Sequence, residues 1–435
     1  MKPLRLSFLA GTAAFCVFAT QAQAGPDLIR SGPALTYGNV SAPGTATSVI
    51  GNPAAGSGAE RPGFRFALIG PVALGYELGD ADDFSEEVED LLDILDRDDI
   101  GQGEAQDMID RFQGLLRDFG KEGYIKVNGS AQVPFTPFVV SNETLGGTVS
   151  LDIRYGGQAR VSFLDDPLVY NSDQDIIETE SAVYVKGGRW REVGVSYGRP
   201  VLELPEGRLH AGVRLVHYEA ELSKTVIALQ DVDSDEDLGD VLSDEYDANT
   251  RRSSAFGLDV GVLWVASNYQ LGATLANLNS PEFDYPRIGR SCDRLSGLRQ
   301  ANCQSAAFFG DRIDLNETYE MAPKLTVEGA WFPFATRRWM LAGSLDVNET
   351  NDPIGDPHRW LSVSGGYIPD SWLMPGFRAG FHRNFSGSEL NYVSLGTTLF
   401  RVFTLDVAWT LDSVDVDGDS YPRSAAVSAG LELAF

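Results

Sequence analysis

The 435-residue sequence is poor in basic residues, in cysteine and in long hydrophobic runs. Its 34 Lys and Arg residues stand against 62 Asp and Glu residues, so the formal net charge is -28. Such a charge repels polyphosphates, which excludes general nucleic-acid binding. After residue 24 there is no apolar run of 18 residues or more, so we expect no membrane-spanning helix. The low charged fraction and the many apolar residues nevertheless predict a folded protein.

The N-terminus has the pattern of a cleavable export signal. Lys2 and Arg5 precede an apolar stretch over residues 6–19, and Ala22-Gln23-Ala24 forms a cleavage site. We therefore expect residues 1–24 to be a signal peptide. Cys292 and Cys303 are the two cysteines outside it, and in an oxidising compartment they predict a disulfide.

From about residue 124 onward, apolar and polar residues alternate, as they do in strands with one apolar face. Val149, Leu151 and Ile153 begin one such series, and the chain ends on another that contains Leu431, Leu433 and Phe435. The segments are about ten residues long, which suits a tilted membrane-spanning strand.

Three observations favour a membrane barrel over a soluble sandwich. Short and long connections alternate in the C-terminal half, as in outer-membrane barrels. The final alternating strand ends on Phe435, and with Leu431 and Leu433 it resembles the signal recognised by the barrel-assembly machinery. Aromatic residues also flank the short turns in the apolar phase, as an interfacial girdle predicts: Trp264, Tyr269, Trp331, Trp339, Tyr367 and Phe377.

We therefore predict an all-β fold, a transmembrane antiparallel β-barrel of about 14 strands. Residues 25–63 form an N-terminal hatch, and residues 64–435 form the barrel. Two amphipathic segments over residues 83–120 predict a helical hairpin insert, which we expect in the periplasm or in the lumen. About 15 segments look like strands, which conflicts with the even strand number of such barrels. Either one of them is miscounted, or residues 64–76 lie outside the wall.

Several short motifs resemble a known family. Gly51-Asn52-Pro53-Ala54-Ala55 follows a small-residue N-terminal segment, and Leu258-Asp259-Val260-Gly261-Val262 and Ser344-Leu345-Asp346-Val347-Asn348 lie in strands. With the acidic hairpin, they resemble outer-membrane barrels of the FadL-like superfamily, most closely the conjugal-transfer TraF-like group. The resemblance covers roughly residues 37–435. It implies a hatch containing Asn52, Pro53 and Ala54, and a hydrophobic ligand that leaves sideways through the wall.

The resemblance implies passive, non-enzymatic transport of small hydrophobic molecules across a Gram-negative outer membrane. The alternative is a structural or interaction protein of conjugal transfer or envelope assembly. Expected partners are outer-membrane lipid, lipopolysaccharide and the barrel-assembly machinery, and no cofactor is expected.

Catalysis is a remote third hypothesis. Gly194-Val195-Ser196-Tyr197-Gly198 matches a nucleophile-elbow pattern, but strand-like sequence follows where that chemistry needs a helix. Ser196 is therefore interpreted as a lumen-facing strand residue. The histidines likewise lack the spacing of a metal site and are interpreted as lumen or interface residues.

Two acidic features suggest cations. Asp415, Asp417 and Asp419 alternate around a glycine turn and are candidate calcium ligands, although Asp-Gly is also an ordinary hairpin turn. Residues 231–247 contain nine acids, which predicts a solvated outer loop; the functional alternative is divalent-cation bridging to lipopolysaccharide phosphates. Charged residues of both signs in the inward phase of the strands predict a lumen braced by ion pairs: Asp152, Arg154, Arg160, Arg214, Asp259, Lys324, Glu328, Asp346, Arg378 and Asp406.

Overall fold

The wall of the molecule is a closed antiparallel β-barrel of 14 strands. The computed structural model describes residues 30–43, 45–58, 63–79, 84–95, 97, 100–232, 238–334, 337–416 and 419–434. The signal-peptide prediction for residues 1–24 therefore lies outside the described residues. No helix in the described ranges is long and apolar enough to cross a membrane.

Fifteen segments make the 14 wall strands, because β2 and β3 are two halves of one strand that both pair with β1 and β4. β1 also pairs with β23, which closes the barrel. In chain order the segments are β1 (Gly63–Leu78), β2 (Tyr124–Gln132), β3 (Phe138–Asn142), β4 (Gly147–Leu164), β7 (Ala182–Leu204), β8 (Gly207–Ala228), β9 (Thr250–Ala266), β10 (Tyr269–Ala276), β13 (Lys324–Trp331), β14 (Trp339–Asp346), β17 (Trp360–Tyr367), β18 (Gly376–Asn384), β19 (Asn391–Leu399), β20 (Phe403–Thr410) and β23 (Ser424–Ala434).

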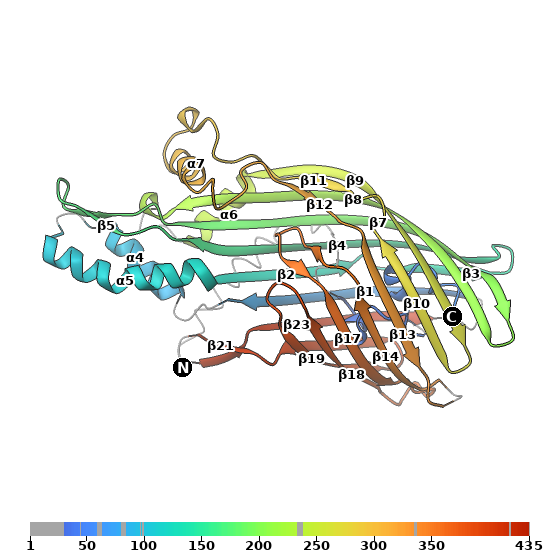
Figure 1. The fold of residues 1–435 in the computed structure, drawn as a ribbon. Helices are drawn as coiled ribbons and strands as arrows, with labels where there is room; N and C mark the ends of the chain where they lie inside the picture. Colours follow the sequence, from blue (N-terminus) through green and yellow to red (C-terminus); the bar gives the residue numbers. More distant parts are fainter. Residues whose placement is uncertain are drawn as a thin grey trace.

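The connections divide the barrel into a short-turn end and a long-loop end (Figure 1). The turns after β9 and β19 have two and three residues, whereas 47 residues separate β10 from β13. β1 starts at the short-turn end, where Arg65 pairs with Ala434. It therefore belongs to the wall, and residues 64–76 do not lie outside it. The predicted number of about 14 strands is confirmed.

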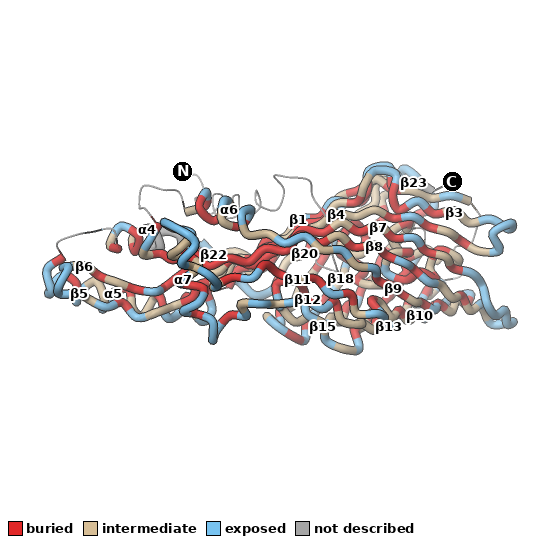
Figure 2. The backbone as a smooth tube through the Cα atoms, turned by 90° about the horizontal axis from the view of Figure 1, so that it is seen from above, coloured by how far each residue is buried: buried red, intermediate tan, exposed pale blue. Residues whose placement is uncertain are grey.

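The long-loop end carries most of the described helices, together with several short hairpins (Figures 1 and 2). We call this group the cap. Its elements are α4 (Phe84–Leu95), α5 (Gln102–Glu122), β5 (Val169–Asn171), β6 (Ile176–Glu178), η1 (Leu229–Asp231), α6 (Leu238–Ala248), β11 (Glu282–Asp284), η2 (Cys292–Arg294), α7 (Leu298–Phe308), β12 (Thr318–Glu320), β15 (Thr350–Asn351), β16 (Pro357–His358), β21 (Ser413–Val416) and β22 (Asp419–Pro422).

The predicted place of the helical hairpin was wrong. α4 and α5 lie at the long-loop end, not in the periplasm or the lumen, because β4, β7 and β8 extend far enough to support them. The apolar face of α5, with Phe112 and Leu116, packs on Phe163 and Val183 of these extensions. Part of residues 231–247 also differs from the predicted solvated loop, since α6 buries Val241, Leu242 and Tyr246 in the same core.

The outer surface of the barrel is apolar where the strands are short. Each of β13, β14, β17 and β20 has eight residues, and their outward phase leaves large side chains such as Leu341 and Val363 exposed. Near the short turns, Tyr269 pairs with Trp331, and Trp339 pairs with Tyr367. An apolar band with aromatic residues at its edge is the surface of an outer-membrane barrel.

The α5 packing predicts a cap that can unfold without the barrel. Phe112→Ala removes a side chain that is 1 % exposed, and we expect it to destabilise the cap by about 3–5 kcal/mol. Thermolysin should then cleave α4 and α5 in the variant while the barrel stays resistant. Arg117→Ala is the control, because that side chain is 62 % exposed on the same helix. Identical cleavage patterns for the two variants would contradict this packing.

Candidate functional site

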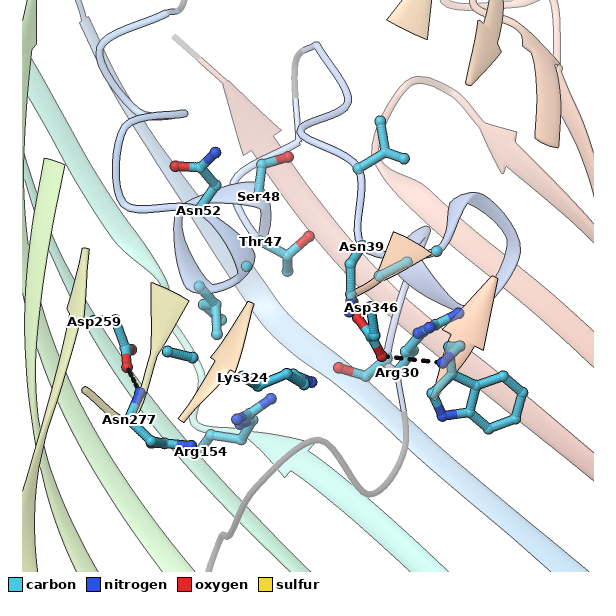
Figure 3. A pocket seen from close by; sticks show the side chains of 18 of the residues that line it. Arg30, Asn39, Thr47, Ser48, Asn52, Arg154, Asp259, Asn277, Lys324 and Asp346 are labelled. Atoms are coloured by element: carbon cyan, nitrogen blue, oxygen red, sulfur yellow. Dashed lines mark hydrogen bonds between the residues drawn. The ribbon is translucent and has the colours of Figure 1, made fainter. Parts of the chain in front are cut away.

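The described residues from 30 to 58 lie inside the barrel, and we call them the hatch. They contain two short helices, α2 (Ala34–Tyr37) and α3 (Ser48–Gly51), joined by irregular chain. Tyr37, Val49 and Ala54 are buried against the wall. Figure 3 shows Asn39, Thr47, Ser48 and Asn52 of the hatch projecting among wall residues. The site is therefore the interface between this segment and the lumen wall.

A row of three glycines lets the Asn52-Pro53-Ala54 segment lie directly against the wall. Gly198, Gly212 and Gly261 are register partners on β7, β8 and β9. A Cβ atom at Gly198 would come within 2.6 Å of the Pro53 carbonyl oxygen, and those at Gly212 and Gly261 would overlap Pro53 and Asn52. The hatch therefore requires residues without a side chain at these three positions of adjacent strands.

Glu328 on β13 is the main polar anchor of the hatch. Its carboxylate accepts hydrogen bonds from the Ser41 amide, from the Ser41 hydroxyl at 2.7 Å and from Asn52 Nδ2 at 2.8 Å. Asn52 Oδ1 in turn accepts from the Ala54 amide at 3.0 Å. One buried wall carboxylate thus holds both halves of the hatch and fixes the turn at Ala54.

Two further wall carboxylates hold other parts of the hatch. Asp406 on β20 accepts from Thr36 Oγ1 at 2.5 Å and is paired with Arg378. Glu432 on β23 accepts from the Ala46 amide at 3.0 Å. β20 and β23 are adjacent in the sheet and are separated from β13 by four strands, so the hatch is held at two distant parts of the wall.

Beyond the hatch, a buried ion-pair network runs along the lumen wall over the adjacent strands β4, β7, β8 and β9. Arg214 on β8 contacts Asp152 at 2.5 Å, Glu192 at 2.5 Å and Asp259 at 3.1 Å, and Arg154 also binds Glu192. The side chain of Arg214 is 3 % exposed. The expected ion-paired lumen is therefore present. Glu192 was not among the predicted inward charges, although it lies in the polar phase of β7 between Arg191 and Val193.

A cavity of about 150 Å³ lies between the hatch and the long-loop end (Figure 3). Its lining includes charged groups of both signs together with the rings of Tyr319 and Trp360. Asp346 accepts a hydrogen bond from the Trp360 amide at 3.2 Å, and Asp259 accepts one from the Asn277 amide at 2.8 Å. The labelled charged residues of the lining are Arg30, Arg154, Asp259, Lys324 and Asp346. A molecule in this cavity would meet both apolar surface and charged groups.

The loop between β15 and β16 borders the cavity on the outer side and is fixed to the wall by charge. Asp356 contacts Lys126 and Arg160, each at 2.6 Å. Burial alone would raise the pKa of Asp356, but these two cations hold the pKa below its ordinary value. Asp352 of the same loop contacts His358 at 3.1 Å. The outer edge of the cavity is therefore ordered.

The wall is irregular beside the hatch, where β1 meets β2 and β3. Residues 67–71 of β1 have no register partner in either half-strand, and the pairing with β23 shifts there twice. Phe135 lies between β2 and β3, and its ring centroid is 5.9 Å from that of Phe66. The ring centroids of Phe138 and Phe64 are 6.5 Å apart. Gly70 lies against Gln132, so the wall is closed at this level.

Ser196 and the histidines His210 and His382 have structural partners. Ser196 is buried in strand β7 and bonds Ser150 at 2.5 Å, and Gly198 of its motif accommodates the hatch. His210 bonds Ser57 of the hatch at 2.9 Å, and His382 bonds Ser362 and Ser394. His210 thus connects the hatch with the wall, whereas Ser196 and His382 bond neighbouring wall strands, and all three side chains face the lumen.

The remaining predicted residues lie at the two ends. Cys292 and Cys303 form a disulfide beside α7, with Cα atoms 5.4 Å apart. Leu431 and Leu433 lie in β23, whereas Phe435 lies outside the described residues. Asp415 and Asp419 belong to the exposed β21–β22 hairpin, and Asp417 is not described. Within the described ranges, no group of three or more His, Cys, Asp or Glu residues could hold a metal ion.

Removal of Arg214 should destabilise the barrel strongly. Arg214→Met leaves Asp152 and Asp259 without their buried cation, which we expect to cost about 3–5 kcal/mol in the free energy of unfolding. Denaturant titration in lipid bilayers measures the loss. The control is Arg208→Met, because Arg208 pairs with Glu203 on the exposed surface and should contribute about 1 kcal/mol or less. Equal losses in both variants would contradict the role of the network.

Several solved structures resemble this chain, including the following three. The Pseudomonas aeruginosa FadL homologue is 10% identical, with 95% of this chain and 100% of that chain covered and a TM-score of 0.42. The Pseudomonas putida toluene transporter TodX is 12% identical (95% and 98% covered, TM-score 0.39). The CymD monoaromatic hydrocarbon channel is 10% identical (94% and 99% covered, TM-score 0.45).

No curated protein matches the chain in sequence. A family model described as "F plasmid transfer operon, TraF, protein" matches residues 49–346. This match runs from the hatch through β14 and includes the Asn52-Pro53-Ala54 segment and the glycine row. The chain belongs to this TraF family.

Proposed function

We propose that this protein passively transports a small molecule across the outer membrane of a Gram-negative bacterium when its hatch moves. The observation that carries the proposal is the cavity between the hatch and the ordered outer loops. The hatch separates this cavity from the short-turn end and is held by hydrogen bonds, which can break and re-form. Displacing the hatch would connect the cavity with the short-turn end of the barrel or with the irregular wall at β1.

The lining of the cavity limits the kind of molecule. The lining carries the charged groups of Arg30, Lys324 and Asp346, and a wholly apolar ligand would remove these charges from water, which is unfavourable. The rings of Tyr319 and Trp360 nevertheless offer apolar contact. We therefore propose a ligand with an apolar body and a polar group, in place of the purely hydrophobic molecule that the family resemblance implies. The phenylalanines around the irregular wall at β1 fit the apolar body of such a ligand.

Loosening the hatch should increase passage. Glu328→Ala removes the acceptor for three hatch hydrogen bonds, each worth about 1 kcal/mol, so we expect at least about a tenfold rise in flux. Proteoliposomes loaded with a fluorescent aromatic carboxylate measure the flux. Glu203→Ala is the control, because Glu203 is an exposed turn residue that bonds Arg208. Unchanged flux in Glu328→Ala, with a hatch shown by proteolysis to be released, would contradict transport.

The ordered cap favours a second candidate, a protein that docks another component of the envelope or of the conjugation machinery. The cap has its own apolar core, and the lumen beneath it is obstructed by the hatch and braced by ion pairs. The exposed acids of α5 offer a way to test docking without unfolding the cap. Under this alternative, Asp107→Asn with Asp110→Asn lowers plasmid transfer between cells and leaves the flux unchanged, whereas transport predicts no change in transfer.

A further inference from the structure

The lipid-facing wall has a hollow of about 800 Å³ near the short-turn end. Its floor is formed by Gly365 on β17 and Ala379 on β18, which are register partners. Leu341 on β14 and Leu395 on β19 flank them in the same row across the sheet. Two small residues between two leucines set the surface back, and the lining is almost wholly apolar.

The hollow lies close to the periplasmic interface of the outer membrane. The adjacent row toward the short turns consists of Trp339, Tyr367 and Phe377, which belong to the aromatic girdle and also line the hollow. Aromatic girdles mark the headgroup level of the bilayer. A hollow just above the girdle at the short-turn end therefore faces the acyl chains of the periplasmic leaflet.

The turns beside the hollow extend its apolar surface. β14, β17 and β20 have eight residues each, and at a tilt of about 40° such strands span about 20 Å, less than the usual apolar band of about 25 Å. The turns after β17 and β19 supply exposed apolar side chains. Trp372 is 61 % exposed and Leu373 is 70 % exposed, and the ring centroids of Trp372 and Phe400 are 5.8 Å apart. The apolar side chains of these turns therefore suit a position at the membrane–water interface.

The same turns carry positive charge in a strongly acidic protein. Arg338 pairs with Asp370, and Arg401 donates to the Asp370 carbonyl oxygen at 3.1 Å. Two arginines thus meet at one aspartate, and its single carboxylate pairs with Arg338, which leaves a net positive charge. The Arg338 side chain is 42 % exposed, and Arg338 directly precedes Trp339 of the hollow. A phosphate at the headgroup level would lie within reach of both arginines.

We propose that this hollow is a binding site for one phospholipid of the periplasmic leaflet. One acyl chain lies over Gly365 and Ala379, and the phosphate pairs with Arg338 and Arg401. The apolar floor, the aromatic level and the positive turns together fit an amphipathic anion whose charge faces the periplasm. Lipopolysaccharide has the opposite orientation, with its phosphates at the long-loop end.

Native mass spectrometry of the barrel from detergent, titrated with phosphatidylglycerol, tests the site. Ala379→Phe fills the floor and should weaken binding about tenfold by excluding roughly two methylene groups. The matched control is Ala273→Phe, at a lipid-facing position of β10 outside the hollow. We expect the control to bind phosphatidylglycerol as the unmodified protein does.

A second pair of variants tests the phosphate contact without altering the wall. Arg338→Gln with Arg401→Gln should weaken binding about tenfold, whereas Arg199→Gln with Arg208→Gln at the β7–β8 turn should not. Equal binding by Ala379→Phe and Ala273→Phe would overturn the proposal. It would also be overturned by selective retention of lipopolysaccharide, or by a change of oligomeric mass in Ala379→Phe without loss of lipid, which would identify an interface between two copies.

Discussion

The close contact between the hatch and the wall is the constraint on which the rest of the lumen depends. At Gly198, Gly212 and Gly261 the wall has no side chains, so the backbone around Pro53 can lie against three strands at once. That position brings Asn52 to Glu328, which also binds Ser41. The remaining lumen side chains then surround a segment whose place is already fixed. A side chain at any of the three glycines would push the hatch away from Glu328.

Polar and apolar side chains are distributed differently in the lumen, on the outer surface and at the long-loop end. In the lumen, acids and arginines are paired with each other or with the hatch, so the interior is polar but filled. On the outside, the short strands expose apolar side chains to lipid. At the long-loop end, strand extensions carry a cap with its own apolar core. The cavity lies where the filled lumen meets this cap, which is why its lining contains both charged groups and aromatic rings.

Much of the barrel could be predicted from the sequence, because a strand with one lipid-facing side has a period of two. The girdle residues and the inward charges follow from the same alternation, and Asp152, Arg214 and Asp406 are buried as their phase predicts. The place of the hairpin was not predictable from its amphipathic pattern. It depends on the direction of β1, and a single miscounted strand reverses that direction.

The hatch interface was also beyond the sequence pattern. Gly198 attracted notice as part of a nucleophile-elbow motif, yet its role appears only when β7, β8 and β9 are in register with Pro53. Inward glycines at matching positions of neighbouring strands would have been the available signal. The pairing of Glu328 with Ser41 and Asn52 joins residues nearly 300 positions apart, and no local spacing indicates it.

Hydrogen exchange of the hatch in lipid bilayers tests the central claim most directly. The amides of Gly32, Ser41 and Ala46 donate to wall side chains, so a seated hatch predicts slow exchange at these three positions. Protection comparable to that of the barrel strands would support the account. Exchange within seconds at all three amides, in a barrel whose strands remain protected, would contradict it.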